Sequence, residues 1–152
     1  MTRLHERIET TLPIEQAFDY IADFSNSETW DPGVVAARRH GDGPLAVGRR
    51  FALDVKMGGR VVPMEYVIAE LQRPDRVVLV GTGSGVDAVD DIRFERTDSG
   101  TLIDYTATIR LGGLLRLAQP FLGSVFERIG RDAAAGMQLT LATLANGPEA
   151  AN

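Results

Sequence analysis

The N-terminal part of the chain combines one strand pattern with two helix patterns. Residues 3–12 are rich in charged and β-favouring side chains and predict a first strand. Between residues 14 and 21 the apolar side chains recur at intervals of three and four, which predicts a helix with one apolar face. Ser25 and Glu28 have the spacing of a capping box, so we expect a second, short helix before the turn at residues 31–33.

The pattern becomes β-like at Val34 and remains so as far as Leu111. Runs of β-favouring residues are separated there by short turns rich in glycine, proline and aspartate. These turns are too short to hold crossover helices, so neighbouring runs should pair antiparallel. Apolar and polar positions alternate in several runs, which predicts one buried face and one wet face. The predicted strands cover residues 34–40, 49–57, 60–71, 76–82, 86–96 and 101–111.

The C-terminal part has a helical period that ends at a stop signal at residues 146–148. If Pro120 lies in the first turn, about 26 residues form an amphipathic helix roughly 39 Å long. Residues 148–152 are expected to be a disordered tail, which leaves one domain over residues 1–147. The predicted apolar stripe of the helix contains Leu122, Val125, Phe126, Ile129, Ala133, Gly136, Met137, Thr140 and Leu144.

This order of elements predicts an α+β fold with a single curved sheet. Seven antiparallel strands would present one dry face, and the long helix is the one element large enough to cover it. We therefore expect the sheet to curl around that helix while the two short helices close one end. A sheet wrapped on one helix seldom fills its concave side, so an apolar cavity is expected between them.

Several short segments accompany this order of elements. They are Pro13 with Ala17-Phe18-Asp19-Tyr20-Ile21-Ala22-Asp23, Trp30-Asp31-Pro32-Gly33-Val34, Val47-Gly48-Arg49-Arg50-Phe51, and Gly100-Thr101. Over residues 3–145 the chain resembles the helix-grip fold of the START-like, or SRPBCC, superfamily, in its polyketide cyclase/dehydrase and lipid-transport branch. The resemblance implies a site between helix and sheet. It implies no single reaction, because the superfamily includes cyclases, hydrolases, lipid carriers and hormone receptors.

Side chains on the inward parity of the strands and helix are the candidate lining of this site. An apolar chamber with a few hydroxyl groups suits a lipid, a sterol or an aromatic polyketide. The alternative is that these side chains pack together as an ordinary core. The candidate ligand-binding residues are Phe51, Leu53, Val55, Met64, Tyr66, Ile92, Phe94, Ile103, Tyr105, Phe126, Ile129, Met137 and Thr140, with Trp30 at the rim as either a lid or an aromatic plug.

Asp90 is the candidate acid or base, because it shares the parity of the apolar residues Ile92 and Phe94. An inward carboxyl group would have a raised pKa and could exchange protons with a ligand. A bulge at this point, or a strand end in solvent, would instead leave it in water. Tyr66 and Tyr105 could orient a ligand through their phenol groups or satisfy those groups locally.

Composition excludes several classes of function. The net charge of −5 lacks the phosphate attraction on which nucleic-acid binding depends. The chain has no cysteine and two histidines, so we expect no disulfide, no metal and no cofactor. No apolar run reaches the roughly 20 residues of a membrane span, and the first residues lack the apolar core of a secretory signal, so a cytoplasmic location is expected.

Two functions follow from these observations, and whether the protein is an enzyme stays open. The first is binding of a small hydrophobic molecule in the cavity. The alternative is a polyketide aromatase or cyclase in which Asp90, Tyr66 or Tyr105 moves protons during aldol closure and dehydration. The sequence also leaves open a protein partner, including a second copy of the chain in a homodimer, at a sheet edge or at the cavity rim.

Overall fold

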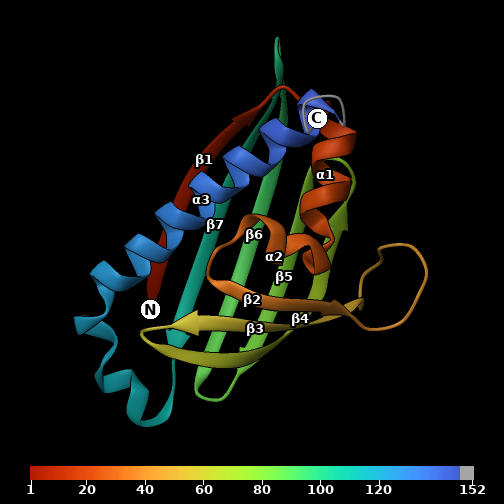
Figure 1. Cartoon of the computed structure of the whole chain (residues 1–152). Coiled ribbons are helices and arrows are strands. Elements are labelled where there is room, and N and C mark those ends of the chain that lie inside the picture. Colours follow the sequence, from red (N-terminus) through yellow and green to blue (C-terminus); the bar gives the residue numbers. More distant parts are fainter. Residues whose placement is uncertain (148–152) are drawn as a thin grey trace.

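The protein folds around one antiparallel sheet, as the computed structural model shows for residues 1–147 (Figure 1). The sheet is seven-stranded with the order β1-β7-β6-β5-β4-β3-β2. Figure 1 shows β2 and β3 running crosswise to β6 and β7, so the sheet is strongly curved. The strands are β1 (Thr2–Thr10), β2 (Val34–Arg39), β3 (Arg50–Met57), β4 (Arg60–Gln72), β5 (Arg76–Gly83), β6 (Val86–Thr97) and β7 (Gly100–Leu111).

The helices lie on the concave side of this sheet. A long helix, α3 (Gly123–Asn146), contacts mainly β1 and the short helix α2 (Ser27–Trp30). A second helix, α1 (Ile14–Ala22), and the 3₁₀ turn η1 (Phe24–Asn26) cover the other side of the concave face (Figure 1). The predicted helix-grip fold is therefore confirmed. No helix within residues 1–147 has the length and apolar character needed to cross a membrane.

Two helix starts differ from the prediction. The long helix begins at Gly123, because the chain around Pro120 forms two 3₁₀ turns, η2 (Gly113–Leu117) and η3 (Gln119–Phe121). The capping-box prediction is also wrong. Asp23, which comes earlier in the chain, accepts from the backbone N–H of Ser25 (3.1 Å) and so begins η1 before the predicted box.

The buried stripe of α3 also departs from the predicted one near its end. Leu144 is 42% exposed, whereas the unpredicted Leu141 is fully buried. The buried row continues along Met137, Leu141 and Ala145 at intervals of four, which keeps these side chains on one face of the helix. The predicted tail, residues 148–152, lies outside the described residues.

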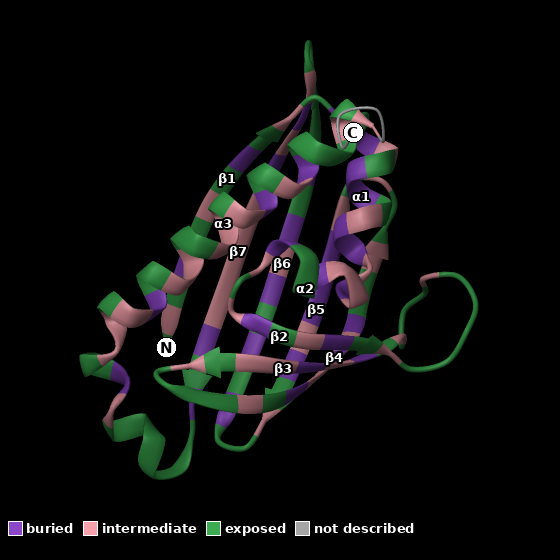
Figure 2. Cartoon of the chain, viewed as in Figure 1, coloured by how far each residue is buried: buried purple, intermediate pink, exposed green. Residues whose placement is uncertain are grey.

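The core occupies the concave side of the sheet. Figure 2 shows buried residues along the central strands and on α1, and exposed residues along the outer side of α3. The rings of Phe18 from α1 and Phe94 from β6 meet edge to face, with centroids 5.1 Å apart. At this end of the sheet, helix and sheet therefore pack directly against each other.

Candidate ligand cavity

A cavity lies between the middle of the concave face, α2 and α3. The space in which the centre of a water molecule can lie is about 110 Å³. Most of the wall is apolar, and partly exposed residues such as Met57 and Ala134 lie at its margin. The arrangement has the form of a small-molecule site, namely an apolar chamber with a few convergent polar groups.

The candidate lining residues fall into two groups. Those that line the cavity are Trp30, Leu53, Val55, Tyr66, Tyr105, Ile129 and Met137. Those placed in the surrounding structure are Phe51, Met64, Ile92, Phe94, Ile103 and Phe126, which are buried in the core, and Thr140, whose hydroxyl donates to the carbonyl of Thr29 (3.1 Å).

The division follows how far along each strand a residue lies. Phe51 and Phe94 have the predicted inward parity, but Phe24 and Phe18 pack against them from the helical side, with ring centroids 6.3 and 5.1 Å apart. Parity specifies the face of a strand and not what covers it. The cavity is left where α3 presents small residues such as Gly130 and Ala133 to the sheet.

Sequence reasoning missed part of the lining. Leu4, Glu6 and Ile8 alternate along β1 and all face the cavity, so their parity could have identified them. The remaining unpredicted residues are mostly small or lie near α2. They are Phe24, Ser27, Asp31, Val34, Met57, Ala88, Ala107, Ile109, Gly130, Ala133 and Ala134.

Asp90 faces into the cavity from the middle of β6. It is paired in regular register with Leu79 of β5 and Ala107 of β7, so there is no bulge at this point. Its side chain is buried, with 5% of the residue exposed. The adjacent Asp91 lies on the opposite face and binds Arg76 (3.0 Å). The inward orientation of Asp90 follows from the alternation of the strand.

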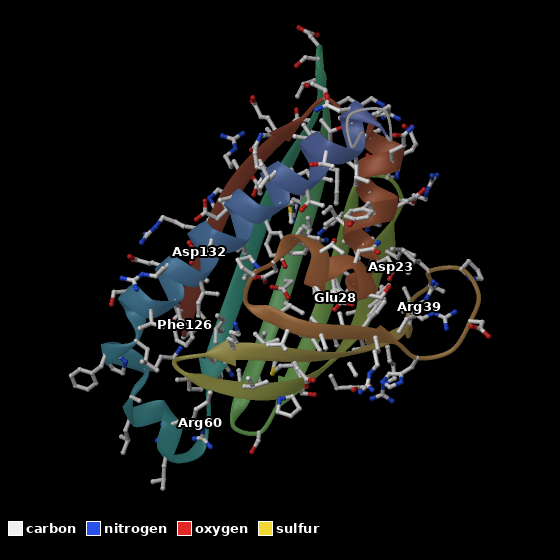
Figure 3. All side chains as sticks on the ribbon, viewed as in Figure 1. Asp23, Glu28, Arg39, Arg60, Phe126 and Asp132 are labelled. Carbon is white, nitrogen blue, oxygen red and sulfur yellow. The ribbon has the colours of Figure 1, made fainter. Side chains whose placement is uncertain are left out.

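Burial, and after it the charge of Asp31, raise the pKa of Asp90 to about 7, although hydrogen bonds from Tyr105 and Tyr66 act in the opposite direction. Burial likewise raises the pKa of Asp31 to about 6. The backbone N–H of Gly33 donates to Asp31 (2.8 Å) and lowers its pKa, while the charge of Asp132 on α3 raises it. Figure 3 labels Asp132 on α3. The cavity thus holds two carboxyl groups that change charge near neutral pH.

Both tyrosines keep their protons at neutral pH. Burial, and then the charge of Asp90, raise the pKa of Tyr66 and of Tyr105 well above the usual value. Both phenols donate toward the carboxyl group of Asp90. A ligand in the cavity would therefore meet a carboxyl group flanked by two phenols that carry their protons.

Trp30 forms part of the cavity wall. It is 3% exposed, and its indole nitrogen is buried without a hydrogen-bond partner among the described residues. The residue is therefore almost completely buried in the wall, and α3 lies close against its backbone. A Cβ atom added to Gly136 would lie 1.9 Å from the carbonyl oxygen of Trp30. The glycine is required for this close approach.

The cavity does not assemble a metal centre. Within residues 1–147, no group of three or more histidine, cysteine or acidic side chains is close enough to hold a metal ion. The described side chains offer the chemistry of carboxyl groups, phenols and aromatic rings on an apolar wall.

Comparison with known proteins identifies this architecture. The family model described as polyketide cyclase / dehydrase and lipid transport matches residues 1–142. No curated protein matches the sequence.

Solved structures share the fold at low sequence identity. A protein from Thermus thermophilus has a TM-score of 0.75 at 14% identity, with 96% of this chain and 98% of that chain covered. A START superfamily protein from Mycobacterium smegmatis has a TM-score of 0.75 at 12% identity, with 93% and 97% covered. Ara h 8.0201 has a TM-score of 0.57 at 12% identity, with 89% and 96% covered. Identities this low show likeness of fold alone.

Proposed function

The chain belongs to the polyketide cyclase/dehydrase and lipid-transport family, and from this membership and the cavity together we propose that it binds a small hydrophobic molecule between α3 and the sheet. The observation that carries the proposal is unfilled space of about 110 Å³ behind a largely apolar wall. Native cores are packed closely enough that such voids are few. Binding of a guest accounts for why this one persists.

The size of the cavity limits the guest. An engineered apolar cavity of about 150 Å³ holds benzene. The cavity as it stands therefore suits one ring or a short chain, such as the terminal ring of an aromatic polyketide-like molecule. A whole lipid or sterol would have to extend past the partly exposed margin at Met57 and Ala134, or move α3 away from β1.

Native mass spectrometry and the fluorescence of Trp30, the single tryptophan of the chain, test this proposal directly. We expect 2-phenylethanol, a neutral single-ring probe, to bind and to change the emission of Trp30, because that side chain lines the cavity. The Ala133→Leu variant should lose binding, because its larger side chain enters the cavity. The matched control is Ala135→Leu on the exposed face of the same helix, which should bind as the wild type does. Equal binding by the two variants, or no binding by the wild type, would contradict the proposal.

One observation favours the cyclase alternative. Asp90 is buried beside two phenols and has a pKa raised to about 7. A group with a pKa close to the working pH is efficient as a general acid or base. In this mechanism Asp90 takes a proton from an activated carbon of a poly-β-ketone, and a phenol donates to the carbonyl oxygen that gains charge during aldol closure.

The alternative is tested by turnover of a poly-β-ketone analogue. We expect Asp90→Asn to lower kcat by about 10²-fold or more, the contribution typical of a general acid or base. Asp91→Asn, on the outer face of the same strand, is the matched control and should leave kcat unchanged. Unchanged turnover in Asp90→Asn would remove the catalytic role and leave the binding function intact.

A further inference from the structure

The charged groups of the cavity are all of one sign. Acidic side chains enter it from three parts of the fold, namely Glu6 on β1, Asp31 between α2 and β2, and Asp90 on β6. Within the described chain, no arginine, lysine or histidine is among the lining residues. The net charge of −5 spread over the surface does not explain why three acids converge on an apolar chamber.

The three acids of the cavity have no positively charged partner in the part of the chain that the structure describes. The phenols of Tyr105 and Tyr66 donate toward Asp90, and the N–H of Gly33 donates to Asp31 (2.8 Å). On the outer face of β6, by contrast, Asp91 forms an ion pair with Arg76 (3.0 Å). A buried carboxylate without a partner is unfavourable, so a ligand that supplies the partner gains from it.

Arg39, at the end of β2, is engaged away from the cavity. Figure 3 shows Arg39 and Asp23 together at the end of β2, away from Asp132 on α3. Arg39 lies 3.7 Å from Asp23 and also donates to the carbonyl of Gly43. No side chain of the described residues therefore supplies the missing positive charge to the cavity.

The aromatic wall also favours a cation. Trp30 and Tyr105 meet edge to face with ring centroids 6.1 Å apart, and Tyr66 lines the same space. A cation gains from contact with the face of an aromatic ring, most of all with tryptophan. An anionic head group would instead lie close to the carboxyl groups of Asp90 and Asp31.

We propose that the cavity selects a single-ring or short-chain apolar amine in its protonated form, with the ammonium group held by Asp90 and Asp31 and the apolar part against Trp30 and the alanines of α3. This inference rests on the proposed binding function and adds the charge of the ligand. The same arrangement discriminates against carboxylate and phosphate head groups, which would meet three like charges.

Binding should depend on pH through the same groups. The carboxyl groups of Asp90 and Asp31, whose pKa values are raised to about 7 and about 6, must both be ionised to hold the ammonium group closely. The other titratable groups that face them are Glu6 on β1, Tyr66 on β4, Tyr105 on β7 and Asp132 on α3. Amine affinity should therefore fall about tenfold per pH unit below about pH 7, where Asp90 takes up a proton. Below about pH 6 it should fall about 100-fold per unit, because Asp31 takes up a proton as well.

A set of three ring compounds tests the proposal on the full chain. They are 2-phenylethylamine, the neutral 2-phenylethanol and the anionic phenylacetate, titrated by calorimetry at about pH 8, where Asp90 is ionised. We expect the amine to bind at least about tenfold more tightly than the alcohol, and phenylacetate to show no measurable binding. Asp90→Asn should remove most of the preference for the amine over the alcohol. Asp31→Asn should weaken the preference in the same direction.

Asp91→Asn is the matched control and should keep the preference, because Asp91 lies on the outer face. Alcohol binding without a preference for the amine would overturn this inference and leave the proposed binding function intact. The inference also fails if phenylacetate binds as tightly as the amine, or if the preference is unaffected by Asp90→Asn. If none of the three compounds binds, the proposed function fails as well.

Discussion

Replacing Asp90 by asparagine should change how the stability of the protein depends on pH. In the folded protein burial raises the pKa of Asp90 to about 7, from a usual value of 3.8. The folded state therefore keeps a proton that the unfolded state releases near pH 3.8. A raised pKa contributes stability that is fully present below the unfolded value and is lost as the pH rises through the folded value.

The magnitude follows from the size of that shift. About three pKa units at about 1.4 kcal/mol each give a loss of about 4 kcal/mol between about pH 4 and about pH 7 in the wild type. The asparagine side chain does not titrate, so the variant lacks this loss. The corresponding contribution of Asp31 cannot simply be added, because its charge is itself one cause of the raised pKa of Asp90.

Denaturant unfolding of both proteins from about pH 4 to about pH 8 measures the effect. The free energy of unfolding of the variant minus that of the wild type should rise with pH by about 1.4 kcal/mol per unit and level off above about pH 7. The cost of placing an amide at this position is independent of pH and drops out of the slope.

Asp91→Asn is the control and should show the opposite sign. Its hydrogen bonds with Arg76 lower the pKa of Asp91, so its contribution to stability is present above the unfolded pKa and is lost in acid. A difference in the free energy of unfolding between Asp90→Asn and the wild type that does not change with pH would refute this reasoning. It would mean that the carboxyl group of Asp90 is as well solvated in the folded state as in the unfolded one.

Two further predictions concern packing. Gly136→Ala should destabilise the protein by about 1–3 kcal/mol in thermal unfolding and shift the emission of Trp30, because the new Cβ would lie 1.9 Å from the backbone oxygen of Trp30. Gly130→Ala in the same helix is the control. Its added Cβ would lie 3.4 Å from the nearest atom, so the variant should be more stable than the wild type by up to about 1 kcal/mol, owing to helix propensity. Equal effects of the two changes would contradict the close approach at Gly136. Gln119→Ala should cost about 1–3 kcal/mol in the same measurement, because the buried amide oxygen of Gln119 accepts from the N–H of Leu111 (3.2 Å). An unchanged melting temperature would show that this hydrogen bond is dispensable.

The fold could be predicted because each element leaves a local signal. The change from a helical period to alternation at Val34, and back after Leu111, marks the sheet, and short turns require antiparallel neighbours. The inward direction of Asp90 followed from parity in the same way. Such inferences depend on the nearest few residues, and the structure changes them little.

The composition of the cavity could be predicted only in part, because it depends on which distant segments meet. Glu6 stands opposite Tyr105 across the pairing of β1 with β7, the first and last strands of the chain. In the sequence Asp31 belongs to the turn that ends the second helix, and only the placement of α2 over the sheet brings it near Asp90. Alternation assigns a face to each side chain, whereas the acidic cluster arises from topology.

The position of α3 explains why the cavity exists at all. The helix contacts mainly β1 and α2, so it lies along one edge of the curved sheet and not over the middle (Figure 1). Close approach at Gly136 to the backbone of Trp30, and at Gly130 to Leu4, is among the contacts that hold it there. Small side chains such as Ala133 face the central strands from the same helix and do not reach across to them. The unfilled space is therefore set by where small residues occur along α3, and enlarging them should remove it without altering the fold.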